Sequence, residues 1–256
     1  MTDTSALRAK LDLGRVIRDT FLVVRRQAVL LFGVTLVLSL LPLIALQYYA
    51  RGVETTAASN PTAALALFAS PVYWGLALVS ALLGCLAYGF QLRIALSELE
   101  GTPATVDEAV QVGLKRLLPI LGVSILMSLG IGFGMLLLIV PGIILALMWS
   151  VALPSVVERG GVFASFGHSR DLTRGNRWRI FALVLIVAVV ILVAQSILMV
   201  LVGGAGNSGT PMFAVVVSSI YSWLMSVLSV VGLAALYIQL RELKGGRGER
   251  VAQVFS

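Results

Sequence analysis

Long apolar runs alternate with short polar segments along the whole chain. A bilayer core about 30 Å thick is crossed by about 20 apolar residues in a helix. Six stretches without a charged residue approach or exceed this length, at 28–50, 72–88, 117–139, 142–157, 180–202 and 212–240, and the second extends as a helix to residue 96. The pattern predicts an all-α, polytopic membrane protein with six transmembrane helices.

The connection between the third and fourth stretches is unusually short. Only Val140-Pro141-Gly142 separates them, which predicts a tight hairpin with its turn at these three residues. The fourth stretch is the shortest and contains Pro154, so we expect it to end early or to lie tilted. An even number of spans places both termini on one side of the membrane.

Composition and charge support this class and orient it. The chain is 59% hydrophobic and only 12% charged, about half the charged fraction of a soluble domain, and it is far too apolar for a disordered chain. Of the 19 Lys and Arg residues, all but Arg51 fall on the side that carries the termini. By the positive-inside rule both termini are cytoplasmic, and we expect a multi-pass protein of a bacterial inner membrane.

A polar segment with helical periodicity precedes each odd-numbered span. Such segments cover 11–26, 105–116, which opens with a Thr-x-x-Glu capping box, and 162–175, where Gly175 suits a left-handed C-cap. We predict three cytoplasmic interfacial amphipathic helices, each followed by a hairpin, at 28–96, 117–158 and 178–240. The single domain then ends in a flexible basic tail at 241–256. On the outer side, Asn60-Pro61 and Ser70-Pro71 predict helix starts.

The chain offers little catalytic chemistry. It has one cysteine, Cys85, and one histidine, His168, so we expect no metal site and no cofactor. Acid, base and histidine do gather at Glu158, His168, Arg170, Asp171 and Arg174, but a hydrolase also needs a nucleophile or metal and a dry pocket. No charged residue lies in the middle of a span, which argues against a proton- or sodium-coupled transporter. We expect no enzymatic activity.

The basic residues next to the membrane are the candidate lipid site. Trp178 would lie at headgroup depth, and the arginines on either side could hold a lipid phosphate. The candidate set is Arg25, Arg26, Lys115, Arg116, Arg170, Arg174, Arg177, Trp178 and Arg179. These residues could equally be unselective topology anchors. Because all this charge faces an anionic leaflet, we expect no nucleic-acid partner.

Small and polar residues form stripes inside the spans. They are Ser124, Ser128, Gly130, Gly132 and Gly134 in the third span, Gln195 in the fifth, and Ser218, Ser222, Ser226 and Ser229 in the sixth. Close helix packing is the default interpretation of such stripes. The alternative is a hydroxyl-lined path across the membrane.

One region carries a family resemblance. It comprises Pro141-Gly142-Ile143-Ile144-Leu145, Leu153-Pro154, Glu158 and the run from Ser169 to Trp178, together with Leu13-Gly14 and Arg25-Arg26. These residues resemble the glycerophosphoryl diester phosphodiesterase membrane-domain family and related six-span bacterial inner-membrane proteins. Some members carry a separate soluble phosphodiesterase domain, and this chain has no room for one. The resemblance therefore implies a membrane module tied to phospholipid or glycerophosphodiester metabolism, without the enzymatic activity.

Together these features predict a non-enzymatic inner-membrane module that binds anionic phospholipid or docks a cytoplasmic or membrane protein partner. The alternative function is a transporter or channel for a lipid-like or neutral solute.

Overall fold

The structure of this chain is a computed structural model that describes residues 11–57, 69–102, 104–204 and 211–254. The described part is all-helical. Its elements are α1 (Leu13–Arg26), α2 (Ala28–Thr35), a π-helical turn (Leu36–Leu40), α3 (Leu41–Ala57), α5 (Pro71–Leu99), α6 (Val106–Leu137), α7 (Ile139–Met148), α8 (Ala152–Arg159), α9 (Val162–Thr173), α10 (Arg177–Gly204) and α11 (Pro211–Val254).

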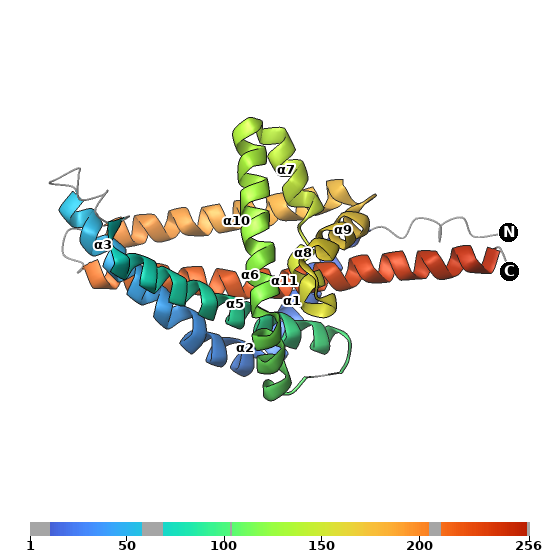
Figure 1. Cartoon of the computed structure of the whole chain (residues 1–256), viewed down its shortest axis with the longest axis horizontal. Coiled ribbons are helices and arrows are strands. Elements are labelled where there is room, and N and C mark those ends of the chain that lie inside the picture. The colour runs from blue at the N-terminus through green and yellow to red at the C-terminus, as the bar shows by residue number, and fades with distance from the viewer. Residues whose placement is uncertain (1–10, 58–68, 103, 205–210, 255–256) are drawn as a thin grey trace.

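Six helical segments are long and apolar enough to cross a membrane, as the sequence predicted. They are Ala28–Ala50, Pro71–Leu99, Val106–Leu137, Ile139–Arg159, Arg177–Val200 and Met212–Gly245. These six segments do not run in one direction. The α2–α3 segment, α5, α10 and α11 extend toward the left of Figure 1, whereas α6 and α7 run across them.

The hydrophobic core lies at one end of the long helices, beside α1, α8 and α9. Phe90 and Ile94 of α5, Ile180 of α10, and Leu236 and Leu240 of α11 are all almost fully buried there. We call this the basic end, because Arg26, Arg116, Arg179 and Arg241 also belong to it. Toward the other end of α10, by contrast, most apolar side chains are exposed.

The polar signals at the helix ends work as the sequence predicted. The Thr105 hydroxyl accepts a hydrogen bond from the Glu108 amide at 3.3 Å. Ser70 caps α5. Pro71 follows it in the first turn of the helix, where proline is favoured. Gly175 has φ +94° after α9, as predicted for a left-handed cap. The predicted helix start at Asn60-Pro61 lies outside the described residues.

The α6–α7 hairpin differs from its prediction in two ways. Its turn is the single extended residue Leu138 (φ −162°, ψ 138°), not Val140-Pro141-Gly142. Pro141 instead lies in the first turn of α7, where a missing backbone N–H breaks no helical hydrogen bond. The segment 105–116 is also not a separate interfacial helix, since α6 continues without a break past Pro119 into the apolar run.

The last two spans differ from their predictions at the ends. The fourth was expected to end early or to lie tilted because of Pro154. It is instead interrupted between α7 and α8, around Trp149, and continues through Pro154 to Arg159. α11 continues as a helix to Val254, where the sequence predicted a flexible tail from residue 241. Each residue added to a helix that is already formed gains one hydrogen bond without a new nucleation step. The polar residues that follow the sixth span can therefore continue its helix.

Candidate functional site at the basic end

Ionisable side chains from three helices meet around Arg241. Its guanidinium contacts the Glu158 carboxylate at 2.7 Å and the Glu100 carboxylate at 2.5 Å. The Tyr237 hydroxyl donates a hydrogen bond to the second oxygen of Glu158. Arg241, Glu158 and Glu100 keep 35, 33 and 30% of their side-chain surface exposed, so water still reaches the cluster. Arg241 therefore holds two carboxylates that would otherwise repel each other.

Local structure places each member of this cluster. Glu100 follows the last turn of α5 as its C-cap, and Glu158 lies in the last turn of α8. Tyr237 and Arg241 are four residues apart on α11, so they share one face of that helix. The cluster thus joins the ends of α5 and α8 to the middle of α11.

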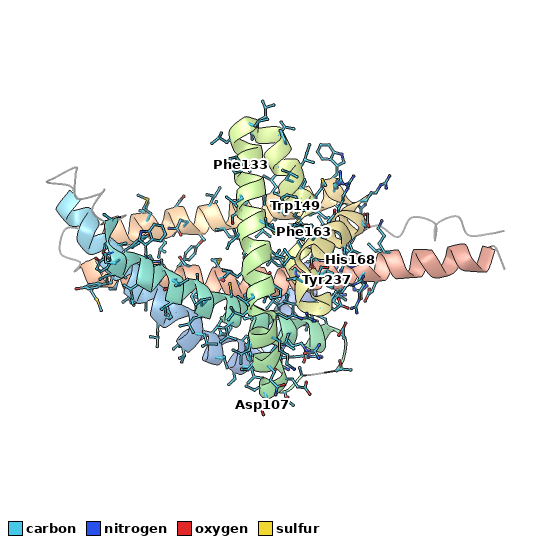
Figure 2. The ribbon with its side chains drawn as sticks, viewed as in Figure 1. Asp107, Phe133, Trp149, Phe163, His168 and Tyr237 are labelled. Atoms are coloured by element: carbon cyan, nitrogen blue, oxygen red, sulfur yellow. The ribbon has the colours of Figure 1, made fainter. Side chains whose placement is uncertain are left out.

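His168 of α9 lies beside this cluster. Its ring meets the Tyr237 ring edge-on, with the centroids 6.3 Å apart. The two labelled residues lie next to each other in Figure 2. Burial lowers the pKa of His168 below its usual value, and the positive charge of Arg159 lowers that pKa further. The Nε2 atom is buried, and no described group accepts or donates a hydrogen bond to it. A neutral imidazole is the favoured state.

The sequence identified part of this cluster. Glu158, His168 and Asp171 do come together, since both carboxylates oppose the lowering of the His168 pKa. Arg170 and Arg174 are exposed and do not join them. Sequence analysis missed Glu100, Tyr237 and Arg241. The sequence contains only a weak signal for their role, because Glu100 and Arg241 look like any other charged residue near the end of an apolar run.

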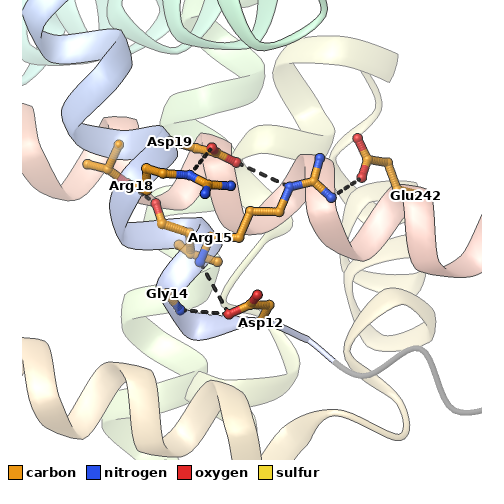
Figure 3. Close-up of polar contacts among 8 residues, drawn as sticks. Asp12, Gly14, Arg15, Arg18, Asp19 and Glu242 are labelled. Carbon is orange, nitrogen blue, oxygen red and sulfur yellow. Dashed lines mark hydrogen bonds and ion pairs between the residues drawn. The ribbon is translucent and has the colours of Figure 1, made fainter.

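A second group of ion pairs ties α1 to α11. Arg15 contacts Glu242 at 3.0 Å and Asp19 at 3.6 Å (Figure 3). The Asp12 carboxylate caps α1 by accepting the amide hydrogen of Gly14 at 2.9 Å. Because the Arg15 side chain is about half exposed, its pairs contribute about 1 kcal/mol or less each. They fix the position of α1 more than they stabilise the fold.

Several of the basic residues proposed for lipid are engaged inside the protein. Arg26 pairs with Glu98 at 3.2 Å, the Arg179 guanidinium donates to the Leu11 carbonyl at 2.6 Å, and the Arg116 guanidinium lies against Gly160. Arg177 has a buried Nε without a partner among the described groups. The exposed members of the set are Arg25, Lys115, Arg170, Arg174 and Trp178, together with Arg26 despite its ion pair.

The glycine pair in α6 packs against the returning chain. A Cβ on Gly130 would collide with the Trp149 ring, and one on Gly134 would lie 3.0 Å from the Gly142 Cα. At Gly132, by contrast, nothing described lies within 4 Å. Ser124 is half-buried and Ser128 is exposed.

The polar residues of the later spans do not line a common path in the described chain. Ser218 donates to the Gln47 side chain at 3.3 Å, while Ser222, Ser226, Ser229 and Gln195 are exposed. α6, which carries the other stripe, runs across α11 (Figure 1). Trp223 is buried, and its indole N–H donates to the Thr35 hydroxyl at 3.1 Å, which fits the packing role that membrane-embedded polar contacts serve.

The described residues contain no candidate metal centre. No group of three His, Cys, Asp or Glu side chains there is placed to hold a metal ion. The cluster around Arg241 combines ion pairs with a buried tyrosine, and such a polar network stabilises the packing of the helices that it joins.

No protein-family model, no curated protein and no solved structure matches this chain.

Proposed function

We propose that this protein is a non-enzymatic module of a bacterial inner membrane that binds anionic phospholipid on the outer face of α9. The observation that carries the proposal is an exposed row of one aromatic and two basic side chains. Phe163 and Arg170 are seven residues apart and so lie on one face of α9, and Arg174 follows directly as the C-cap of that helix. Phe163 is 81% exposed, and the two arginines are exposed as well.

The opposite face of α9 supports this assignment. Ser165, Ser169 and Leu172 are buried, and the Ser169 hydroxyl donates to the Met148 carbonyl at 2.8 Å. The helix is therefore held by one face, which leaves the other free. Trp178 is 84% exposed just beyond α9, and exposed aromatic rings beside arginines are suited to the headgroup region of a bilayer.

The proposed orientation places this face toward the cytoplasm. All Lys and Arg residues except Arg51 belong to the side that carries the termini, and anionic headgroups of the cytoplasmic leaflet attract such charge. The resemblance to the glycerophosphoryl diester phosphodiesterase membrane-domain family agrees with a role in phospholipid metabolism and stays a prediction. A cytoplasmic protein that carries acidic residues could use the same face.

Native mass spectrometry of the purified protein tests the lipid site. Wild type should retain phosphatidylglycerol in preference to phosphatidylcholine, and Arg170→Gln/Arg174→Gln should lose about 30-fold in affinity, because each arginine near the headgroups contributes about 1 kcal/mol. Arg18→Gln/Lys244→Gln removes the same charge elsewhere and should retain the lipid. Equal loss in both variants would show unselective attraction and refute a site on α9.

A further inference from the structure

We infer that the α6–α7 hairpin does not cross the bilayer but lies within the leaflet at the basic end, with its tip among lipid acyl chains. The chain would then cross the membrane with four of its six candidate spans, namely the α2–α3 segment, α5, α10 and α11. The inference is independent of the headgroup site on α9.

The direction of the hairpin is the first argument. α10 and α11 run along the long axis of the molecule, and α6 with α7 runs across them (Figure 1). If α10 and α11 cross a bilayer, a hairpin at this angle lies along the membrane plane. Length does not decide the question, because the 21 residues from Leu117 to Leu137 would reach about 31 Å as a helix.

Close backbone contacts hold α6 in this direction. A Cβ on Gly89 of α5 would lie 2.9 Å from the Gly113 Cα, so α5 and α6 cross with their backbones almost touching. Further along α6, Gly122 faces Val162 of α9. These two contacts, nine residues apart in α6, fix the hairpin at its base.

The composition of the turn is the second argument. Residues 129–148 contain no charged side chain, no Ser, Thr, Asn or Gln, and no Tyr or Trp. The other two connections at the far ends of the spans are polar, with Arg51 and Glu54 in one and Asn207 and Ser208 in the other. A turn that emerged at the outer surface would be expected to carry such residues, or the aromatic residues of the interface.

The tip also meets the conditions for burial in hydrocarbon. Leu136 and Leu137 are 84 and 77% exposed in the protein, which leaves them to contact lipid. The Leu138 amide donates to the Gly134 carbonyl at 3.1 Å, and the Gly142 amide donates to the Leu138 carbonyl at 3.4 Å. Pro141 has no amide hydrogen to satisfy. These two bonds and the proline reduce the number of unpaired backbone groups at the turn, which favours an apolar environment.

Charged residues flank the apolar hairpin at both of its ends. Lys115 and Arg116 precede the apolar run, and Glu158 and Arg159 follow it. A hairpin that enters and leaves on the same side preserves the observed charge partition, with or without a full crossing. The charge pattern alone therefore cannot distinguish the two arrangements, and a measurement of depth can.

A spin-label depth scan of the full chain tests the inference. Single cysteines in a Cys85→Ser background replace the exposed residues Leu114, Leu118, Ile125, Leu129 and Leu136, which share one face of α6. The same scan on Leu185, Leu192 and Met199 of α10 provides the reference for a crossing helix. The protein is reconstituted in vesicles of phosphatidylcholine and phosphatidylglycerol, and collisions of the label with oxygen and with a water-soluble nickel chelate are measured.

On α10 the oxygen-to-nickel ratio should be highest at residue 192 and fall at 199. On α6 the ratio at residue 136 should stay as high as at 129. A fall at 136 to the value at 199 would show that the hairpin crosses, and would overturn the inference. Low collision with both reagents at 136, together with a disulfide between two copies of Leu136→Cys, would show that a second copy covers the tip and would also overturn it.

Discussion

At the scale of single residues, Arg241 has the most consequential position. It belongs to a helix predicted only as a span and tail, yet it pairs with carboxylates 83 and 141 positions earlier in the chain. Glu158 has a second partner in the Tyr237 hydroxyl. Removing the guanidinium would leave two carboxylates close together without a counter-charge, and such a loss is more costly than the loss of a surface ion pair.

We expect Arg241→Gln to lower the free energy of unfolding by about 1–3 kcal/mol. Arg15→Gln, which breaks the exposed pairs with Asp19 and Glu242, should lower it by about 1 kcal/mol or less. Thermal unfolding in detergent measures both. Adding Glu100→Gln and Glu158→Gln to the Arg241 variant should restore part of the loss, and no restoration would argue against carboxylate repulsion as the cause.

His168 gives the cluster a pH dependence. Because its pKa in the folded protein is lowered from 6.5 by burial and by Arg159, the unfolded chain binds a proton first as the pH falls. Stability should therefore decrease as the pH drops through about 6.5 toward the lowered pKa. Melting temperatures at about pH 7.5 and about pH 5.5 should differ more for wild type than for His168→Gln. An equal difference in both proteins would assign the effect to other groups.

At the scale of elements, the α6–α7 hairpin shows how small residues determine a turn. α6 and α7 approach so closely that the Gly142 position leaves no room for a side chain: a Cβ there would lie 2.7 Å from the Met135 amide nitrogen. The obstructing atom is backbone, which cannot move without displacing the helix. The sequence motif around Pro141-Gly142 therefore has a packing role that its spacing alone did not reveal.

Gly142→Ala should destabilise the hairpin by about 1–3 kcal/mol, because the added methyl group overpacks the contact between α6 and α7. Gly132→Ala is the matched control in the same hairpin. It meets no described atom within 4 Å and should be neutral or stabilising by up to about 1 kcal/mol. Thermal unfolding distinguishes them, and a similar loss in both variants would contradict the packing argument.

At the scale of the whole molecule, the buried core is concentrated at the basic end. Buried residues of α5 and α11, such as Phe90 and Leu240, meet α8 and α9 at that end. Most of the exposed apolar side chains lie on α10 and on the α6–α7 hairpin. Such an exposed surface is suited to lipid and would be far too large for water.

The proposed orientation predicts opposite labelling at the two ends. In a Cys85→Ser background, Ala69→Cys should react with a membrane-impermeant thiol reagent added to intact cells, because Ala69 is exposed two residues before α5. Asp171→Cys, exposed on α9, should react only after the membrane is made permeable. The reverse pattern would invert the orientation, since the positive-inside rule places Asp171 in the cytoplasm.

The sequence by itself determined the all-helical class and the positions of the six apolar helices. The division of charge between two sides of a membrane stays a prediction. The class and the helix positions follow from local composition and periodicity, which need no knowledge of distant contacts. Capping at Thr105 and the positive φ of Gly175 were predictable for the same reason.

Only the tertiary structure decided the direction of α6 and α7, the turn at Leu138 and the assembly of Glu100, Glu158, Tyr237 and Arg241. Each depends on which segments far apart in the chain pack together, and a pattern read along the chain does not contain that information. The exposed and engaged members of the basic set also look alike in sequence: Arg174 is free of described contacts, whereas Arg179 bonds to Leu11. Their difference arises only when α10 packs beside the segment that precedes α1.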